Sequence, residues 1–69
     1  MKIKTAIISI ENLSQDALAP LAHAFRAIPG VQSVDFSLER SVAVVEFDPD
    51  QSNVDDLLRA VLKAGYKVA

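Results

Sequence analysis

Cysteine and tryptophan are absent from this chain, and glycine occurs only twice in its 69 residues. Without cysteine the chain has no disulfide, no thiolate metal ligand and no thiol nucleophile. Two glycines are too few for a glycine-rich phosphate-binding loop. No apolar run approaches the roughly 20 residues that a membrane-spanning helix needs. These absences argue against thiol redox chemistry, nucleotide binding and direct insertion into a membrane.

Charge is also scarce, with seven Lys and Arg residues against nine Asp and Glu residues and a formal net charge of −2. This balance provides no basic face, so we expect no nucleic-acid partner. Hydrophobic residues make up 51% of the chain, which is typical of a folded domain. The length predicts one domain over residues 1–69. Because the domain has no disulfides and no visible targeting segment, we expect it in the cytoplasm.

The hydrophobic pattern predicts strands and helices in the order βαββαβ. Strands are expected at 2–10, 31–38, 42–47 and 66–68, and the first helix at 17–28 with an irregular opening turn around Pro20. Ser14 or Asp16 is available to cap that helix. A capping box opens the second helix, formed by Ser52 with Asp55 or by Asn53 with Asp56, and the helix ends at 64–65. The expected inward residues of the hairpin and second helix are Val34, Phe36, Leu38, Ala43, Val45, Phe47, Leu57, Leu58, Val61 and Leu62.

This order predicts an α+β fold of the ferredoxin-like type. Two split βαβ units give a four-stranded antiparallel sheet with both helices on one face. In chain numbering the strand order is 4-1-3-2. Because the first strand carries apolar residues on both faces, it is expected in the middle of the sheet.

Several short blocks of the chain resemble the heavy-metal-associated domain of copper chaperones and metal-transporting P-type ATPases. They are the helix end at 28–31, the hairpin segments 34–39 and 43–48, the helix segment 57–61 and the Ala-Gly-Tyr of 64–66. Their spacing follows the family, and the resemblance covers essentially the whole chain. It implies a role in metal transport, with another metal-transport component as a possible protein partner.

The defining motif of that family is missing. Its members carry Gly-Met-x-Cys-x-x-Cys after the first strand, where two thiolates bind a soft ion. Alignment back from Gly30 without a gap places the two cysteines on Ser14 and Ala17. Alignment of the core methionine with Leu13 places them on Gln15 and Leu18 instead. Neither alignment provides a sulfur ligand, so the copper chemistry of the family is expected to be absent.

Other candidate ligands are few. Glu11, Asp16 and His23 offer a weak set for a metal ion bound without thiolates. The resemblance places Tyr66 beside the metal loop, where we expect it to pack against Leu13. The acidic residues of 48–56 fit a turn and a helix cap better than a calcium loop.

We therefore predict a cysteine-less protein-interaction or regulatory domain with no cofactor. The single histidine lacks a nucleophile or carboxylate at a suggestive spacing, so we expect no enzyme. The alternative is a small-molecule sensor of the ACT type, which shares the βαββαβ order. Its expected glycine-containing loop is missing from 11–19. A possible interface is the open face of the sheet, with Ile3, Ile7, Val42 and Val44.

Overall fold

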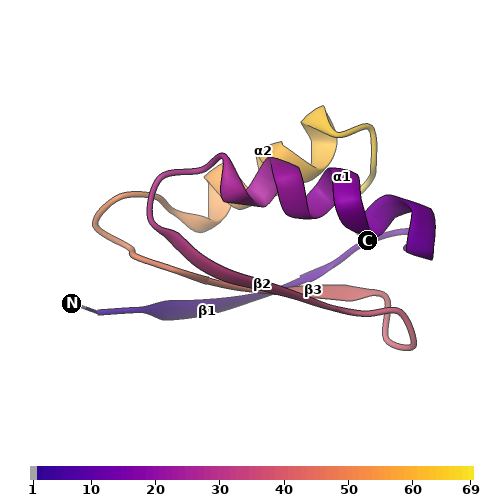
Figure 1. Ribbon diagram of the computed structural model, residues 1–69, viewed down its shortest axis with the longest axis horizontal. Coiled ribbons are helices and arrows are strands. Elements are labelled where there is room, and N and C mark those ends of the chain that lie inside the picture. The colour runs from indigo at the N-terminus through magenta and orange to yellow at the C-terminus, as the bar shows by residue number, and fades with distance from the viewer. Residues whose placement is uncertain (1) are drawn as a thin grey trace.

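The computed structural model describes residues 2–69 and contains three strands and two helices. The strands form one antiparallel sheet in the order β1-β3-β2, and both helices cover the same face of it (Figure 1). This arrangement confirms the α+β class and the placement of the helices. The elements are β1 (Lys4–Ser9), α1 (Gln15–Arg26), β2 (Val31–Ser37), β3 (Val42–Phe47) and α2 (Val54–Lys63).

The predicted fourth strand is wrong for this structure. After α2 the chain returns to the free side of β1, but only one bridge forms there, between Ile10 and Val68. The N–H of Ala69 donates to the carbonyl of Ser9 at 2.9 Å and the N–H of Glu11 donates to the carbonyl of Lys67 at 2.8 Å, so the contact is a single bridge and not a strand. As a result β1 lies at the edge of the sheet over most of its length. The expectation that its two apolar faces mark a central strand is also wrong, because Ile7 is 71% exposed.

The sheet has one core face and one open face. Ala6 and Ile8 of β1 and Ile10 just after it point toward the helices and are at least 92% buried. Their neighbours along the strand point to the open face, because successive side chains of a strand alternate. In β3 the buried members are Ala43, Val45 and Phe47, as the alternation predicts.

Helix α1 begins at Gln15 and ends at Arg26, two residues earlier at each end than predicted. Ser14 is the N-cap residue, although its side chain makes no capping hydrogen bond. Pro20 lies inside the helix. Because proline has no N–H, one hydrogen bond of the helix is missing at this point. The shift still leaves Leu21 and Phe25 fully buried.

Helix α2 begins with the capping box of Asn53 and Asp56. The side chain of Asn53 accepts from the N–H of Asp56 at 2.9 Å, and the Asp56 carboxylate accepts from the N–H of Asn53 at 3.0 Å. This start directs Leu57 and Val61 into the core, where both are fully buried. The prediction that Leu62 lies on the core face is wrong, because its side chain is 58% exposed. Each residue advances about 100° around a helix, so Leu62 turns away from the sheet.

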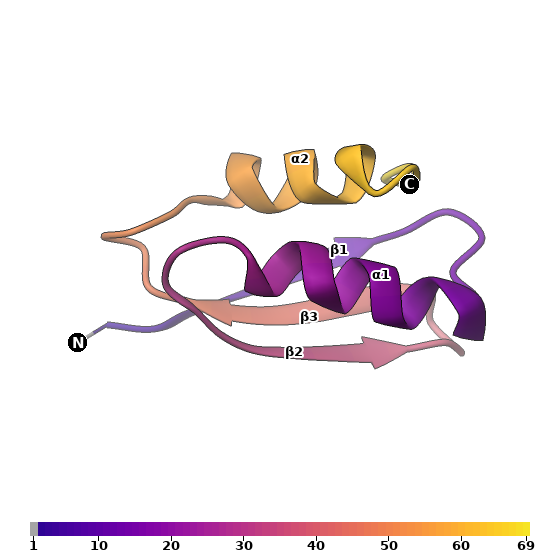
Figure 2. The same cartoon turned by 45° about the horizontal axis from the view of Figure 1, so that its top comes forward.

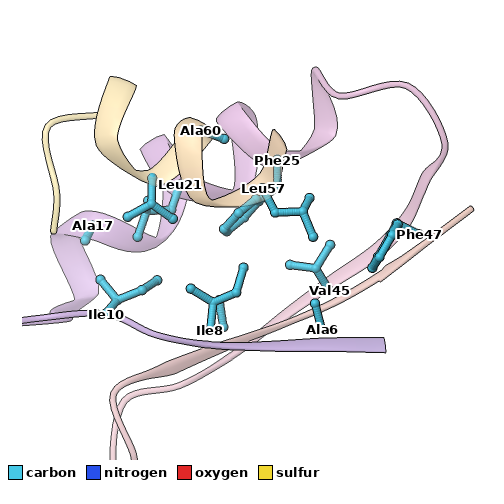
Figure 3. Close-up of a cluster of buried hydrophobic side chains, with 12 residues drawn as sticks. Ala6, Ile8, Ile10, Ala17, Leu21, Phe25, Val45, Phe47, Leu57 and Ala60 are labelled. Atoms are coloured by element: carbon cyan, nitrogen blue, oxygen red, sulfur yellow. The ribbon is translucent and has the colours of Figure 1, made fainter. Parts of the chain in front are cut away.

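The core lies between the sheet and the two helices (Figure 3). Phe25 of α1 is fully buried and lies 6.5 Å from Phe36 of β2, measured between ring centroids. Phe36 is half-buried at the margin of this cluster. The predicted inward position of Leu38 is wrong, since β2 ends one residue earlier and Leu38 is 44% exposed in the turn.

Two left-handed glycines shape the ends of the helical segments. Gly30 has a φ of +85°, and its carbonyl accepts from the N–H of Asp48 at 2.9 Å. A Cβ atom at this position would lie 2.8 Å from Cβ of Gln51 and 3.2 Å from Cβ of Asp48. Gly65 has a φ of +92°, but a Cβ atom there would meet nothing within 4 Å. The α1–β2 turn therefore needs glycine for space as well as for conformation.

Candidate functional site

The candidate site is the loop that joins β1 to α1, at the end of the sheet where the C-terminal residues return (Figure 2). Asn12 turns this loop with a φ of 55°, a left-handed conformation that asparagine adopts more readily than most residues. The N–H of Glu11 donates to the carbonyl of Lys67 at 2.8 Å. These two features bring the loop beside the segment that follows α2.

Ser41, the last residue of the turn before β3, holds the loop from the other side. Its hydroxyl donates to the carbonyl of Ile10 and accepts a long hydrogen bond of 3.4 Å from the N–H of Leu13. Its own carbonyl accepts from the N–H of Ile10 at 2.9 Å. Sequence analysis missed this residue. Its only signal is a small polar residue at the end of a hairpin turn, and the left-handed φ of 57° that aims its side chain cannot be seen in the sequence.

The four positions that align with the family's cysteines offer little to a soft metal. Ser14 and Gln15 are exposed at the start of α1, Ala17 is fully buried, and Leu18 is half-buried. Their donors are one hydroxyl and one amide. Thiolate and thioether ligands select Cu(I), and oxygen donors are poor substitutes for them. The residues present in this loop therefore do not fit a soft metal ion.

Leu13 and Tyr66 are both half-buried and pack against the core cluster. Beside them lies a shallow hollow of about 300 Å³, lined by Glu11, Asn12, Gly65, Tyr66 and Lys67. The hollow carries one acidic and one basic side chain but no group of metal ligands. The β1–α1 loop is thus fixed by Ser41 on one side and by the segment that follows α2 on the other.

The three residues expected to bind a metal ion without thiolates do not lie together in the structure. Glu11, Asp16 and His23 are all exposed, and within residues 2–69 no three His, Cys, Asp or Glu side chains gather as a metal site. His23 lies near the end of α1, more than two turns from the helix start. The two carboxylates and the imidazole therefore do not converge on one point.

The acidic segment between β3 and α2 has a structural role. Asp48 is only 7% exposed, and its carboxylate accepts from the side-chain amide of Gln51 at 3.0 Å and from the N–H of Asp50 at 2.9 Å. The hydrogen bond from Gln51, followed by the one from Asp50, lowers the pKa of Asp48 below its usual value. Together with the capping box on Asp56, this agrees with the predicted turn and helix cap.

The open face of the sheet carries the predicted apolar patch in part. Ile7 is directly opposite Val44 on the neighbouring strand, and Ser9 is opposite Val42. Ile7 is 71% exposed, whereas Val42 and Val44 are half-buried. Ile3 lies just before β1 and is 40% exposed.

A second hollow lies between the two helices on their outer side. It measures about 460 Å³ and is lined by Ala24, Ala27, Ile28, Pro29, Asp56, Arg59, Ala60 and Lys63. Its position shows that the side of α2 with Arg59 and Lys63 faces α1. None of the helices in residues 2–69 is long and apolar enough to cross a membrane.

Comparison with solved structures defines the class of this protein as a small metallochaperone-like domain. The crystal structure of oxidized MerP from Ralstonia metallidurans CH34 superposes with a TM-score of 0.88 at 28% identity, over 99% of this chain and 96% of that one. The CopZ metallochaperone superposes with a TM-score of 0.90 at 27% identity, over 96% of this chain and all of that one. Three strands and two helices are therefore enough to reproduce the shared fold.

The family profile described as the heavy-metal-associated domain matches residues 22–67, and the chain belongs to this family. The mercuric transport protein periplasmic component of Salmonella typhi is 41% identical over 44 residues, which are 64% of this chain and 48% of that protein. The chain thus spans about half the length of the curated relatives it matches. The profile match begins after the β1–α1 loop, the segment in which this chain lacks the family's cysteines.

Proposed function

We propose that this chain is a heavy-metal-associated module that acts as a protein-interaction or regulatory domain in metal transport and does not carry a soft metal ion in its loop. The observation that carries this proposal is the donor set of the β1–α1 loop. Ser14 and Gln15 supply oxygen and amide donors, and Ala17 and Leu18 supply none. The fold is retained around this loop, which supports a role for the scaffold itself.

The direct test is a titration with Cu(I) in the presence of a high-affinity Cu(I) chelator, repeated with Hg²⁺ and Zn²⁺. We expect the chelator to retain the copper, because oxygen donors do not compete with it. A cysteine-containing member of the family is the positive control. Retention of one equivalent of Cu(I) by this chain would contradict the proposal.

Introducing two cysteines tests whether the absence of thiolates is the only reason that this loop does not bind Cu(I). We expect Gln15→Cys with Leu18→Cys to bind Cu(I) better than Ser14→Cys with Ala17→Cys. The reason is burial: Ala17 is fully buried, and burial in apolar surroundings raises a thiol pKa and so disfavours the thiolate. Leu18 is half-buried at the surface of α1. If neither double variant binds Cu(I), the loop has lost more than its ligands.

The interaction role rests on the open face of the sheet. The exposed Ile7 and the half-buried Val44 form an apolar pair there, with Glu46 and Asp35 on neighbouring positions. We propose this face as the contact surface for a metal-transport component. Titration of the ¹⁵N-labelled chain with the metal-binding domain of a transport ATPase from the same organism should shift amide signals of β1 and β3. Val44→Lys should abolish these shifts, whereas Asp16→Asn on α1 is the matched control. Absence of any shift would remove the support for this surface.

The compartment is a separate proposal. We place the protein in the cytoplasm because a small domain without disulfides is more typical of a reducing compartment, whereas the curated relative is named as a periplasmic component. Fractionation of cells that express the tagged protein tests this location. We propose no catalytic activity for the domain.

A further inference from the structure

The hollow between the two helices has the size of a site for a small molecule. Helices α1 and α2 pack side by side on the sheet and run in opposite directions (Figure 2). The hollow between their outer sides measures about 460 Å³ and is here called the interhelical hollow. Small-molecule sites in proteins occupy about 300–1,000 Å³. The residues that line the hollow therefore decide what it can hold.

The floor of the interhelical hollow is apolar, and small side chains leave it open. Ala24 of α1, Ala27 at its C-cap and Ala60 of α2 line it, and Ala60 is only 7% exposed. A methyl side chain fills little of the space where two helices meet. Ile28 and Pro29, just after α1, add two larger apolar side chains. An apolar floor with a few polar groups beside it is the usual composition of a ligand site.

Two cationic side chains lie on one side of this floor. Arg59 and Lys63 both line the hollow and are exposed, and they are four residues apart on the same side of α2. The side-chain hydrogen bonds within residues 2–69 use neither group. Like charges at this spacing weaken a helix, and only Lys63 lies in the last turn, where the helix dipole favours a cation. An anion between the two groups would remove their repulsion.

The single acidic residue of the lining gives the hollow a direction. The carboxylate of Asp56 already accepts from the N–H of Asn53 at 3.0 Å in the capping box. Asp56 lies seven residues before Lys63, or about 10 Å along the helix axis. Because the helices run in opposite directions, Ile28 and Pro29 lie toward the Asp56 end. One end of the hollow is therefore cationic, and the other is apolar and acidic.

We propose that the interhelical hollow binds a small amphipathic carboxylate. Its anionic group lies between Arg59 and Lys63, and its apolar body covers the alanine floor toward Ile28. The guanidinium group can hold a carboxylate through two parallel hydrogen bonds, and the lysine adds a point charge. A ligand of about ten non-hydrogen atoms needs roughly 300 Å³, if each takes the volume of a water molecule in the liquid. The hollow has room for such a ligand.

Other occupants fit less well. Arg59 and Lys63 repel a metal ion or an organic cation. A stable protein interface buries about 800 Å² on each partner, whereas eight residues line this hollow. Because the hollow is open and both cations are exposed, we expect a dissociation constant of roughly 1 mM. Such a ligand would act on the helices and not on the β1–α1 loop, so this proposal does not rest on the proposed function.

Titration of the ¹⁵N-labelled chain with sodium hexanoate at constant ionic strength tests the proposal. The titration extends to about 20 mM, well above the expected dissociation constant. Hexanoate should cause saturable shifts of the amide signals of the lining residues, namely Ala24, Ala27, Ile28, Arg59, Ala60 and Lys63. Acetate lacks the apolar body and hexan-1-ol lacks the charge, so each should bind at least about 3-fold more weakly. Hexylammonium should cause no saturable shift.

Two kinds of variant locate the ligand. Ala27→Leu should abolish the saturable shifts because the larger side chain fills the hollow, whereas Ala19→Leu, at an exposed position of α1 outside the lining, is the matched control. Arg59→Gln and Lys63→Gln should each raise the dissociation constant by about 2- to 5-fold. Arg40→Gln removes the same charge from the β2–β3 turn and should change it less. Circular dichroism establishes that each variant is folded.

Several results would overturn the proposal. Absence of saturable shifts with hexanoate shows that the hollow does not take this class of ligand. Equal binding of hexan-1-ol shows that the two cations take no part. Equal binding of acetate shows that the apolar floor takes no part, and a carboxylate side chain of a protein would then serve as well. Equal effects of Ala19→Leu and Ala27→Leu, or of Arg40→Gln and Arg59→Gln, place the ligand outside the hollow.

Discussion

The two glycines provide a matched pair of substitutions that separates backbone strain from lack of space. Gly30 and Gly65 have nearly the same φ, +85° and +92°. An alanine in the left-handed region costs roughly 1–2 kcal/mol at either position. The same substitution also restricts the unfolded chain, which offsets about 0.4–1 kcal/mol in both cases. These two contributions should be equal for the two variants.

The surroundings of the two glycines differ. At Gly30 an added Cβ atom would lie 2.8 Å from Cβ of Gln51 and 3.2 Å from Cβ of Asp48, and both are backbone-attached atoms that cannot rotate away. Overpacking of this kind costs roughly 1–3 kcal/mol. At Gly65 nothing lies within 4 Å. We therefore expect Gly30→Ala to lower the free energy of unfolding by about 1–3 kcal/mol more than Gly65→Ala does.

Urea unfolding followed by circular dichroism at both positions measures this difference. A single core of this size provides only about 3–5 kcal/mol, so Gly30→Ala should be close to unfolding in the absence of urea. Gly65→Ala should retain a clear transition. Equal midpoints for the two variants would refute the close contact between Gly30 and the Asp48 turn.

Three further predictions concern the core, the turn and the helix caps. Phe25→Ala should lower the free energy of unfolding by about 3–5 kcal/mol and Phe36→Ala by less, because only Phe25 is fully buried; equal urea midpoints would contradict this. The lowered pKa of Asp48 contributes stability that is present above about pH 3.8 and lost as pH falls through the lower folded-state value. Urea midpoints at pH 5 and below should therefore fall less steeply for Asp48→Asn than for the wild type, and identical slopes would contradict the turn's hydrogen bonds. Asn53→Ala should cost about 0.5–2 kcal/mol, whereas Ser14→Ala should cost much less because Ser14 makes no side-chain capping bond.

Local patterns in the sequence were sufficient for most of the fold. The alternation in the hairpin located β2 and β3. Of the two capping pairs that the sequence offered, Ser52 with Asp55 and Asn53 with Asp56, the second opens α2. These features depend on neighbours in the chain, so a single sequence reveals them. The predicted start of α1 was two residues late because Asp16 was taken as the cap, which put Pro20 at the end of the first turn; the N-cap residue is Ser14, and Pro20 lies deeper in the helix.

The errors arose where long-range contacts decide the structure. Whether Tyr66 to Ala69 form a strand depends on how many residues can lie beside β1, which composition does not reveal. The two apolar faces of β1 predicted a buried central strand, but Ile7 is exposed at an edge. Leu62 was placed in the core because leucine is usually buried, although the phase of α2 turns it outward.

The candidate site was predicted only in outline. The sequence located the loop and its missing thiolates, and the family resemblance placed Tyr66 beside it; the expected packing of Tyr66 against Leu13 stays a prediction. It did not reveal Ser41, because that contact joins residues about thirty positions apart and depends on a turn conformation. The proposed roles of Ser14, Gln15, Ala17 and Leu18 stay predictions until the metal titrations are made.

The hydrogen bonds of Ser41 also have a consequence for the order of folding. They join residues 28 and 31 positions apart, and they require β1 and β3 to be paired already. Contacts so distant in the sequence form late, because closing the intervening chain costs entropy before the contact repays it. The β1–α1 loop should therefore take its shape after the sheet has assembled. Ser41→Ala should accordingly accelerate unfolding and leave the rate of folding nearly unchanged.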